Sequence, residues 1–264
     1  MFRIAIPSYK RAEMLGKKTL SFLSENGINP ELIDIFVASE AEEKEYREKL
    51  RPGTYGRLIV GHLGIARQRT FIQQFYPLGQ KVWSLDDDIR GIVSLREDLN
   101  LIQFVEEMFE LCEREKVNMW GIYPAGTKYY LKDEIKKGVI YIVACFYGYI
   151  NQKDMIYPPV DTKEDWWSTL ERCRLDGAVL RCNSVAPKTT YWLKTGGLAE
   201  TRTLELEKVH SATVASMFPQ YAEGWYMRRN GHPDVKLKRL PCVILTRLTV
   251  GTLEVQQREF RLIG

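Results

Sequence analysis

The sequence predicts an α/β fold in which a mostly parallel central sheet carries helices on both faces. In the first half of the chain, short apolar runs rich in Ile, Val and Phe alternate with helical stretches. Such alternation is typical of a parallel sheet with covering helices. One of these runs ends in three consecutive aspartates at 86–88. Ligands bind at the carboxyl ends of the strands in open α/β sheets, so this stretch also marks the expected site.

The first half supplies the expected parallel strands. A helix is expected to stop at Gly27, a residue typical of helix C-termini. Ser39 and Glu42 form a capping box at the start of the next helix. The expected strands cover 2–7, 33–38, 57–60 and 81–85, and the expected helices cover 12–26, 40–50 and 65–75.

The second half has a less regular pattern. A Gly-, Lys- and Thr-rich loop is expected at 186–203. No stretch of the sequence has the composition of a linker between domains, so we expect a single domain over 1–264. The expected strands are 118–123, 139–149 (long enough to bend or to form two), 176–181 and 235–240, and the expected helices are 100–115, 163–174 and 204–218.

Composition narrows the functional classes. The 264 residues include 45% hydrophobic and 27% charged residues, which is typical of a globular protein. No apolar run approaches the roughly 18 residues that suggest a membrane span. The chain opens as a strand, so no signal peptide is expected. The five cysteines are scattered, which favours reduced thiols in a cytoplasmic protein. The formal charge of +4 is modest, but basic residues crowd the C-terminal quarter.

The three aspartates predict a metal site. Asp86, Asp87 and Asp88 repel one another unless a cation lies among them, and hard oxygen ligands suit Mg²⁺ or Mn²⁺. Residues two apart in an extended segment share one side, so Asp86 and Asp88 are expected to act together. Asp87 is then expected to point away and fix the turn. The alternative is a solvated acidic turn or a helix N-cap.

Three motifs together resemble the family-2-like glycosyltransferases of the GT-A fold. They are the opening IAIPSYKR, the stretch GIARQRT before the strand that ends in Asp-Asp-Asp, and Lys-Glu-Asp at 163–165. The resemblance covers roughly residues 1 to 220. Within the fold, the chain is similar to base J and Tet-associated phage glycosyltransferases in the motifs IPSYKR and GIARQR, in their short spacing and in its compact size. Those enzymes act on 5-hydroxymethylpyrimidines in DNA.

The resemblance implies a UDP-sugar donor, with glucose the expected sugar, and a divalent metal. It implies a nucleotide-sugar-binding half at 1–95 and an acceptor-binding half at 96–264. The expected reaction is an inverting transfer to DNA in the cytoplasm, which is the host cytoplasm if a phage encodes the protein. The alternatives are a glycan or protein acceptor, a nucleotidyltransferase, and a non-catalytic nucleic-acid-binding module. The first loop has no glycine before Gly16, which disfavours the nucleotidyltransferase.

The resemblance also implies the donor-binding residues. Asp86 and Asp88 divide the metal and the sugar or ribose hydroxyls between them. Of the two arginines in GIARQRT, Arg67 is favoured, and the alternative is that one of the pair only balances the aspartates. The full expected donor-binding set is Pro7, Ser8, Tyr9, Arg11, His62, Arg67, Arg69, Asp86, Asp87 and Lys194.

Histidines and a basic loop complete the expected donor site. His210 is the expected third metal ligand beside Asp86 and Asp88, with His232 as competitor, and a helix-packing histidine is the alternative. The loop that holds Lys188, Lys194, Gly196 and Gly197 is expected to close over the diphosphate, with an ordinary connection as the alternative.

The acceptor site is expected around the second acidic motif. Asp165 is the expected general base, with Glu164 next in line, and simple capping of a helix is the alternative for both. Trp166 and Trp167 are expected to offer a stacking wall, with burial in the core as the competing account. The basic residues Lys236, Lys238 and Arg239 are expected to neutralise DNA phosphates.

Overall fold

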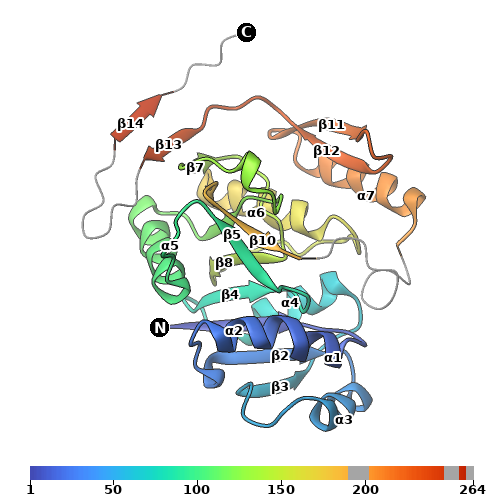
Figure 1. The fold of residues 1–264 in the computed structure, drawn as a ribbon. Helices are drawn as coiled ribbons and strands as arrows, with labels where there is room; N and C mark the ends of the chain where they lie inside the picture. The colour runs from blue at the N-terminus through green and yellow to red at the C-terminus, as the bar shows by residue number, and fades with distance from the viewer. Residues whose placement is uncertain (190–201, 247–255, 260–264) are drawn as a thin grey trace.

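A ten-stranded sheet organises the protein. The computed structural model describes residues 1–189, 202–246 and 256–259 (Figure 1). The strand order is β14-β13-β7-β9-β6-β8-β4-β1-β2-β3. The α/β class expected from the sequence is confirmed.

The strands of the large sheet are β1 (Phe2–Pro7), β2 (Ile33–Val37), β3 (Arg57–Val60), β4 (Lys81–Leu85), β6 (Met119–Ile122), β7 (Ile135–Gly138), β8 (Phe146–Ile150), β9 (Val179–Cys182), β13 (Val243–Thr246) and β14 (Gln256–Glu259). Two small antiparallel sheets join β5 (Gly91–Ser94) to β10 (Val185–Lys188), and β11 (Ala222–Met227) to β12 (Pro233–Leu237).

The helices are α1 (Ala12–Leu15), α2 (Ser21–Glu25), α3 (Glu40–Lys49), α4 (Ile65–Phe75), α5 (Leu101–Glu115), α6 (Glu164–Asp176) and α7 (Leu204–Met217). A π-helical turn (Gly16–Leu20) joins α1 to α2, and short 3₁₀ turns cover Pro30–Leu32 and Lys128–Tyr130. No helix in the described part of the chain is long and apolar enough to cross a membrane.

Strand direction defines the edge at which a site can form. β3, β2, β1 and β4 are neighbours and run parallel, so their carboxyl ends meet at one edge. β8 inserts antiparallel between β4 and β6, and β9 pairs parallel with β6. The aspartates after Leu85 therefore lie where the parallel strands end.

The two faces of the sheet bury different helices. On β1, Ile4 and Ile6 face the core that includes residues of α1, α2 and α5, such as Leu15 and Phe104. Ala5 faces the other way and packs in a second core with Ile72 of α4 and other residues. This alternation of faces along the strand agrees with the predicted cover of helices on both sides.

A third core joins the C-terminal part of the described chain to α6. It includes Trp167 of α6, Val214 and Phe218 around the end of α7, and Val235 of β12. Figure 1 shows the β11–β12 hairpin beside α7 at the upper right. The third core thus places this hairpin close to α6.

The stretch 139–149 differs from the prediction of a long strand. Strand pairing covers Ile135–Gly138 and Phe146–Ile150, and the residues between them leave the ladder. β7 pairs with β9 and β13, whereas β8 pairs with β4 and β6, so the chain leaves the ladder to cross from one part of the sheet to another. Two carbonyls near the end of this crossing contact the acidic turn and its arginine: Ala144 O accepts from Arg69, and Cys145 O accepts from the Asp86 amide.

An ionic network closes the other end of the parallel strands. Asp34 on β2 is fully buried and accepts hydrogen bonds from Arg57 Nε (2.6 Å), from Arg3 Nε (3.0 Å) and from the Tyr76 hydroxyl (2.7 Å). Burial alone would raise the pKa of Asp34, but the hydrogen bonds from Arg57, Arg3 and Tyr76 outweigh it and lower the pKa.

We predict that Asp34→Asn lowers the free energy of unfolding by about 3 kcal/mol, because it leaves two arginines without their buried partner. Chemical denaturation at pH 7 measures the loss. The folded pKa lies below the unfolded value of about 3.9, so the contribution is complete above that pH and is lost as the pH falls through the folded pKa. Glu45→Gln, in the exposed pair with Lys49, is the control and should cost about 0.5 kcal/mol or less. An equal effect of both variants would contradict the prediction.

Candidate active site

The end of β4 forms a tightly bonded acidic turn. The Asp86 amide donates to Cys145 O (3.0 Å), and the Asp86 carbonyl accepts from the Thr19 hydroxyl (2.8 Å). The Thr19 hydroxyl oxygen also accepts from the Ile89 amide (3.0 Å), so it bridges the turn on both sides. Thr19 lies in the π-helical turn and is fully buried. A single threonine inside a predicted helix carries no sequence signal for this role.

Each aspartate contacts a different part of the fold. Asp86 Oδ1 pairs with Arg69 of α4 (3.0 Å). Asp87 Oδ2 accepts from the Ser8 hydroxyl (2.7 Å), and its Oδ1 pairs with Arg11 (3.3 Å). Asp88 Oδ1 accepts from the Thr189 hydroxyl (2.6 Å). The carboxylates are thus held apart by separate partners.

Arg69 links two acidic motifs that lie far apart in the sequence. Besides Asp86, its guanidinium lies 3.6 Å from Glu164 Oε1 at the start of α6 and donates to Ala144 O (3.1 Å) and Tyr147 Oη (3.0 Å). Burial alone would lower the pKa of Arg69, but the surrounding Tyr147, Asp86 and Glu164 raise it, so the charge is retained. Arg67, favoured from the sequence for the nucleotide, is exposed, and of these two arginines Arg69 is the one that pairs with Asp86.

The acid pair at the start of α6 has two different environments. Glu164 is buried, and burial, together with the charge of Asp165, raises its pKa to about 7 against the opposing effect of Arg69. Asp165 is partly exposed; its Oδ1 accepts from the Trp166 amide (2.8 Å) and its Oδ2 from the Tyr141 hydroxyl. Asp165 therefore caps its own helix and is oriented by Tyr141, a residue that the sequence did not single out.

The acidic turn has the character of a cation site. Burial raises the pKa of Asp86 to about 7 against the effect of Arg69, and burial raises the pKa of Asp87 to about 6. A divalent cation would favour the charged forms, and Mg²⁺ is commonly held by one or two carboxylates plus substrate phosphates. Asp86 and Asp88 fit that donor set.

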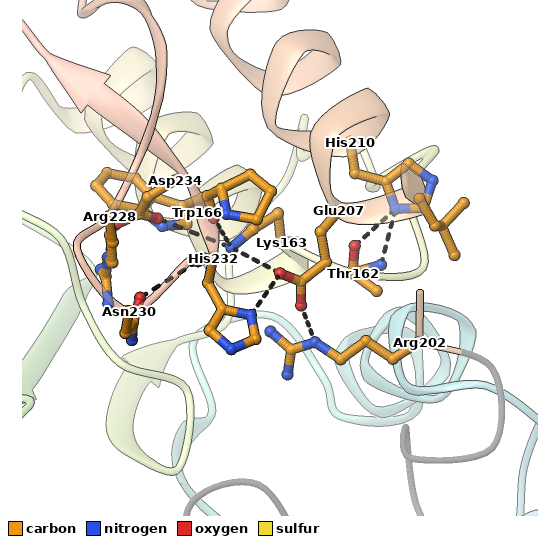
Figure 2. A network of polar contacts seen from close by, with 12 residues as sticks. Thr162, Lys163, Trp166, Arg202, Glu207, His210, Arg228, Asn230, His232 and Asp234 are labelled. Atoms are coloured by element: carbon orange, nitrogen blue, oxygen red, sulfur yellow. Dashed lines mark hydrogen bonds and ion pairs between the residues drawn. The ribbon is translucent and has the colours of Figure 1, made fainter. Parts of the chain in front are cut away.

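The predicted three-residue metal set is not formed in the described part of the chain. No group of three or more His, Cys, Asp or Glu side chains that could hold a metal occurs there. His210, on α7, instead accepts from the Thr162 amide at Nδ1 (3.1 Å) and lies 2.8 Å from the Thr162 hydroxyl (Figure 2). The competing His232 lies 3.6 Å from Glu207. Both histidines thus have polar contacts outside the acidic turn.

The two tryptophans are buried, so the predicted stacking wall is wrong for this structure. Trp166 and Trp167 expose only 5% and 2% of their surface. Trp166 stacks on Tyr141 with centroids 4.4 Å apart, and Trp167 Nε1 donates to Ile156 O (2.8 Å). Burial of these large aromatic rings in the core beside α7 is favoured over exposure to water, which explains why both side chains are buried.

The loop after β1 is held by α3. The Ser8 hydroxyl contacts Tyr46 Oη (2.7 Å) as well as Asp87, and Tyr46 Oη accepts from the Arg11 amide (3.0 Å). Ser8 and Pro7 are buried, so the Ser8 hydroxyl serves the loop in place of the predicted base or ribose contact. Tyr9 is partly exposed beside this loop. Tyr46 lies in a highly charged helical stretch, which hid its role in the sequence.

The remaining predicted residues that the structure describes lie on other elements. His62 is exposed, and its ring packs edge-on against Phe71 with centroids 5.2 Å apart. Lys188 is exposed at the end of β10. Lys194, Gly196 and Gly197 lie outside the described residues. Lys236, Lys238 and Arg239 are exposed on and after β12, where Lys236 pairs with Glu223 (2.6 Å).

Comparisons with known proteins identify the fold. No family model and no curated protein matches the chain. The structure of M. tuberculosis glucosyl-3-phosphoglycerate synthase, solved with Mn²⁺, UDP and glucosyl-3-phosphoglycerate, matches with a TM-score of 0.54 and 10% identity over 91% of this chain and 88% of that one. S. aureus TarS 1-349 matches with a TM-score of 0.52 and 13% identity over 81% of this chain. The match spans 64% of the TarS chain. Both neighbours are GT-A glycosyltransferases, so the expected GT-A fold is confirmed.

We predict that Arg69→Met lowers the free energy of unfolding by about 3 kcal/mol, because Asp86 and Glu164 then lose their shared buried cation. Arg67→Met, two residues earlier on the same helix, is the matched control and should stay within about 0.5 kcal/mol of the wild type. Urea denaturation of the two variants measures both values. If Arg69→Met were as stable as Arg67→Met, the link between the two acidic motifs would carry no stabilisation.

Proposed function

We propose that the protein is a metal-dependent glycosyltransferase that moves a sugar, with glucose the expected one, from a UDP-sugar to an acceptor hydroxyl. The observation that carries the proposal is the approach of two acidic motifs, 86–88 and 164–165, on either side of Arg69 at the carboxyl edge of the parallel strands. A fold neighbour from M. tuberculosis was solved with Mn²⁺ and UDP, which supports this class of donor.

The acidic turn is the proposed donor site. Asp86 and Asp88 would hold a divalent metal, which when bound neutralises charge on the diphosphate leaving group. Arg69 pairs with Asp86, compensates its negative charge and holds the acidic turn against α4. Ser8 and Arg11 hold Asp87 against the β1 loop, so the loop and the turn form one rigid surface for the nucleotide.

The acid pair is the proposed source of the general base. An inverting transfer needs a carboxylate to take the proton of the acceptor hydroxyl as that oxygen attacks the anomeric carbon. Asp165 is the proposed base because it is partly exposed, whereas Glu164 is buried behind it. The Tyr141 hydroxyl orients the Asp165 carboxylate.

The proposed acceptor is a 5-hydroxymethylpyrimidine in DNA. The β11–β12 hairpin and the residues after it expose aromatic side chains, Trp225 and Tyr226, together with basic ones. Arginine and lysine neutralise phosphates, and exposed aromatic rings can stack an extruded base. A glycan or protein hydroxyl is the alternative acceptor. The exposed basic residues are Arg228, Arg229, Lys236, Lys238 and Arg239.

We predict that UDP binds only together with Mn²⁺ and that Asp88→Asn abolishes the binding, because one of the two metal-holding carboxylates is then removed. Isothermal titration calorimetry with and without EDTA measures this. Asp98→Asn, an exposed aspartate on the segment after β5, is the control and should bind as the wild type does. Unchanged UDP affinity in EDTA or in Asp88→Asn would refute the metal site.

We predict that Asp165→Asn slows sugar transfer by about 10² to 10⁴, the range expected for loss of a general base. Binding of UDP and Mn²⁺ should survive because the donor site lies on a different element. Single-turnover assays of Asp165→Asn and Glu164→Gln separate the two acids. A wild-type rate for Asp165→Asn with a slow Glu164→Gln would move the base to Glu164.

We predict that changing Lys236, Lys238 and Arg239 to Gln weakens DNA binding and flattens its salt dependence, by roughly one unit of slope for each phosphate that the variant no longer neutralises. Fluorescence anisotropy at several salt concentrations measures the slope. The same change at Lys44, Arg47 and Lys49 of α3 removes equal charge from a distant surface and is the control. Identical slopes in both triple variants would exclude the hairpin as the DNA-binding surface.

A further inference from the structure

A buried ionic cluster lies next to the acid pair, on the side of α7 and the hairpin. It consists of Lys163, Glu207 and Asp234, and we call it the Lys163 cluster. The Lys163 ammonium lies 3.9 Å from Glu207 Oε2 and 3.9 Å from Asp234 Oδ1, and it donates to Pro233 O at 2.6 Å. Figure 2 shows the three residues converging from α7, from β12 and from the position before α6. One side chain therefore connects three elements.

The cluster is shielded from water. The exposed fractions of the side chains are 10% for Lys163, 2% for Glu207 and 3% for Asp234. Further cations surround it: Arg202 pairs with Glu207 Oε1, and Arg228 Nε donates to Asp234 at 2.6 Å. Buried ion pairs often stabilise a fold less than apolar residues of equal size would. The cluster therefore calls for a role beyond simple packing.

Lys163 also occupies an unusual backbone conformation. Its φ of 65° and ψ of 19° place it in the left-handed region, where a residue with a Cβ is strained. It is the residue immediately before Glu164 and Asp165, and its carbonyl accepts the first hydrogen bond of α6 from the Trp167 amide (3.0 Å). The backbone and the side chain of Lys163 together set how the first turn of α6 leaves the preceding loop.

We propose that Lys163 is a positioning residue for the acid pair. Its side chain fastens the first turn of α6 to α7 through Glu207 and to β12 through Asp234 and the Pro233 carbonyl. Glu164 and Asp165 are thereby held in fixed register with the β11–β12 hairpin, the element that exposes the proposed acceptor surface. The inference rests on the proposed function for the role of the acid pair, but the anchoring itself concerns the fold alone.

The test compares two substitutions that separate charge from backbone strain. Lys163→Asn removes the ammonium but keeps a residue that tolerates the left-handed conformation. Lys163→Arg keeps the charge and can reach the same carboxylates. Lys208→Asn, on α7, removes an exposed cation paired with Glu205 and is the control. Glu207→Gln removes the counter-ion and checks the pair from the other side.

Two readouts distinguish this inference from the proposed function. Hydrogen exchange of the amides at 165–168 reports the anchoring without any substrate, and we expect it to be about tenfold faster in Lys163→Asn and in Glu207→Gln. Transfer kinetics report the consequence: kcat should fall by about 10² in Lys163→Asn, as expected for a displaced catalytic group, with KM for the UDP-sugar unchanged. In Lys163→Arg, both the exchange rate at 165–168 and kcat should stay close to the wild-type values.

Unchanged exchange at 165–168 in Lys163→Asn would overturn the inference, as would an equal change in Lys208→Asn. Faster exchange spread over α5 as well would also overturn it, because that result indicates general destabilisation. If the wild type transferred no sugar, the proposed function would fail, and the exchange experiment would still decide whether Lys163 anchors α6.

Discussion

Arg69 lies buried between Asp86 at the end of β4 and Glu164 at the start of α6, and the rest of the site depends on this position. The positive charge of Arg69 lowers the pKa of both carboxylates and so opposes the effect of burial, which raises each to about 7. The guanidinium also donates to the Ala144 carbonyl in the segment between β7 and β8. One side chain thus sets the charge balance of the site and ties this segment to the acidic turn.

The first half of the fold was predictable because its signals are local. Alternating strands and helices, the cap at Ser39 and the acidic end of β4 are all readable within a few residues. The irregular parts were not, because distant partners decide them. The break at 139–145 depends on which strands β7 and β8 pair with, and the burial of Trp166 and Trp167 depends on α7 and Tyr141. No local pattern contains that information.

In the candidate site, too, the features with a local sequence signal were predictable and those that depend on distant partners were not. The sequence singled out both acidic stretches: 86–88 because three consecutive aspartates follow an apolar run, and 164–165 because Lys-Glu-Asp resembles a motif of the GT-A family. The sequence could not show which of Arg67 and Arg69 pairs with Asp86, because two arginines two residues apart on a helix differ only in the face they occupy. Thr19, Tyr46 and Tyr141 were missed because hydroxyl groups are common inside expected helices and expected strands. Their importance arises from what they touch, namely the acidic turn, the β1 loop and Asp165.

The proposed function is tested most directly by identifying the reaction product. The protein would be incubated with UDP-glucose, Mn²⁺ and duplex DNA that contains 5-hydroxymethylcytosine or 5-hydroxymethyluracil, and the digested nucleosides would be analysed by mass spectrometry. A panel of other nucleotide sugars and an EDTA control complete the experiment. The proposed function predicts a hexose added to the hydroxymethyl group only when metal is present. Absence of any glycosylated nucleoside across the panel would contradict the DNA acceptor, and sugar transfer that persists in EDTA would contradict the metal-dependent site.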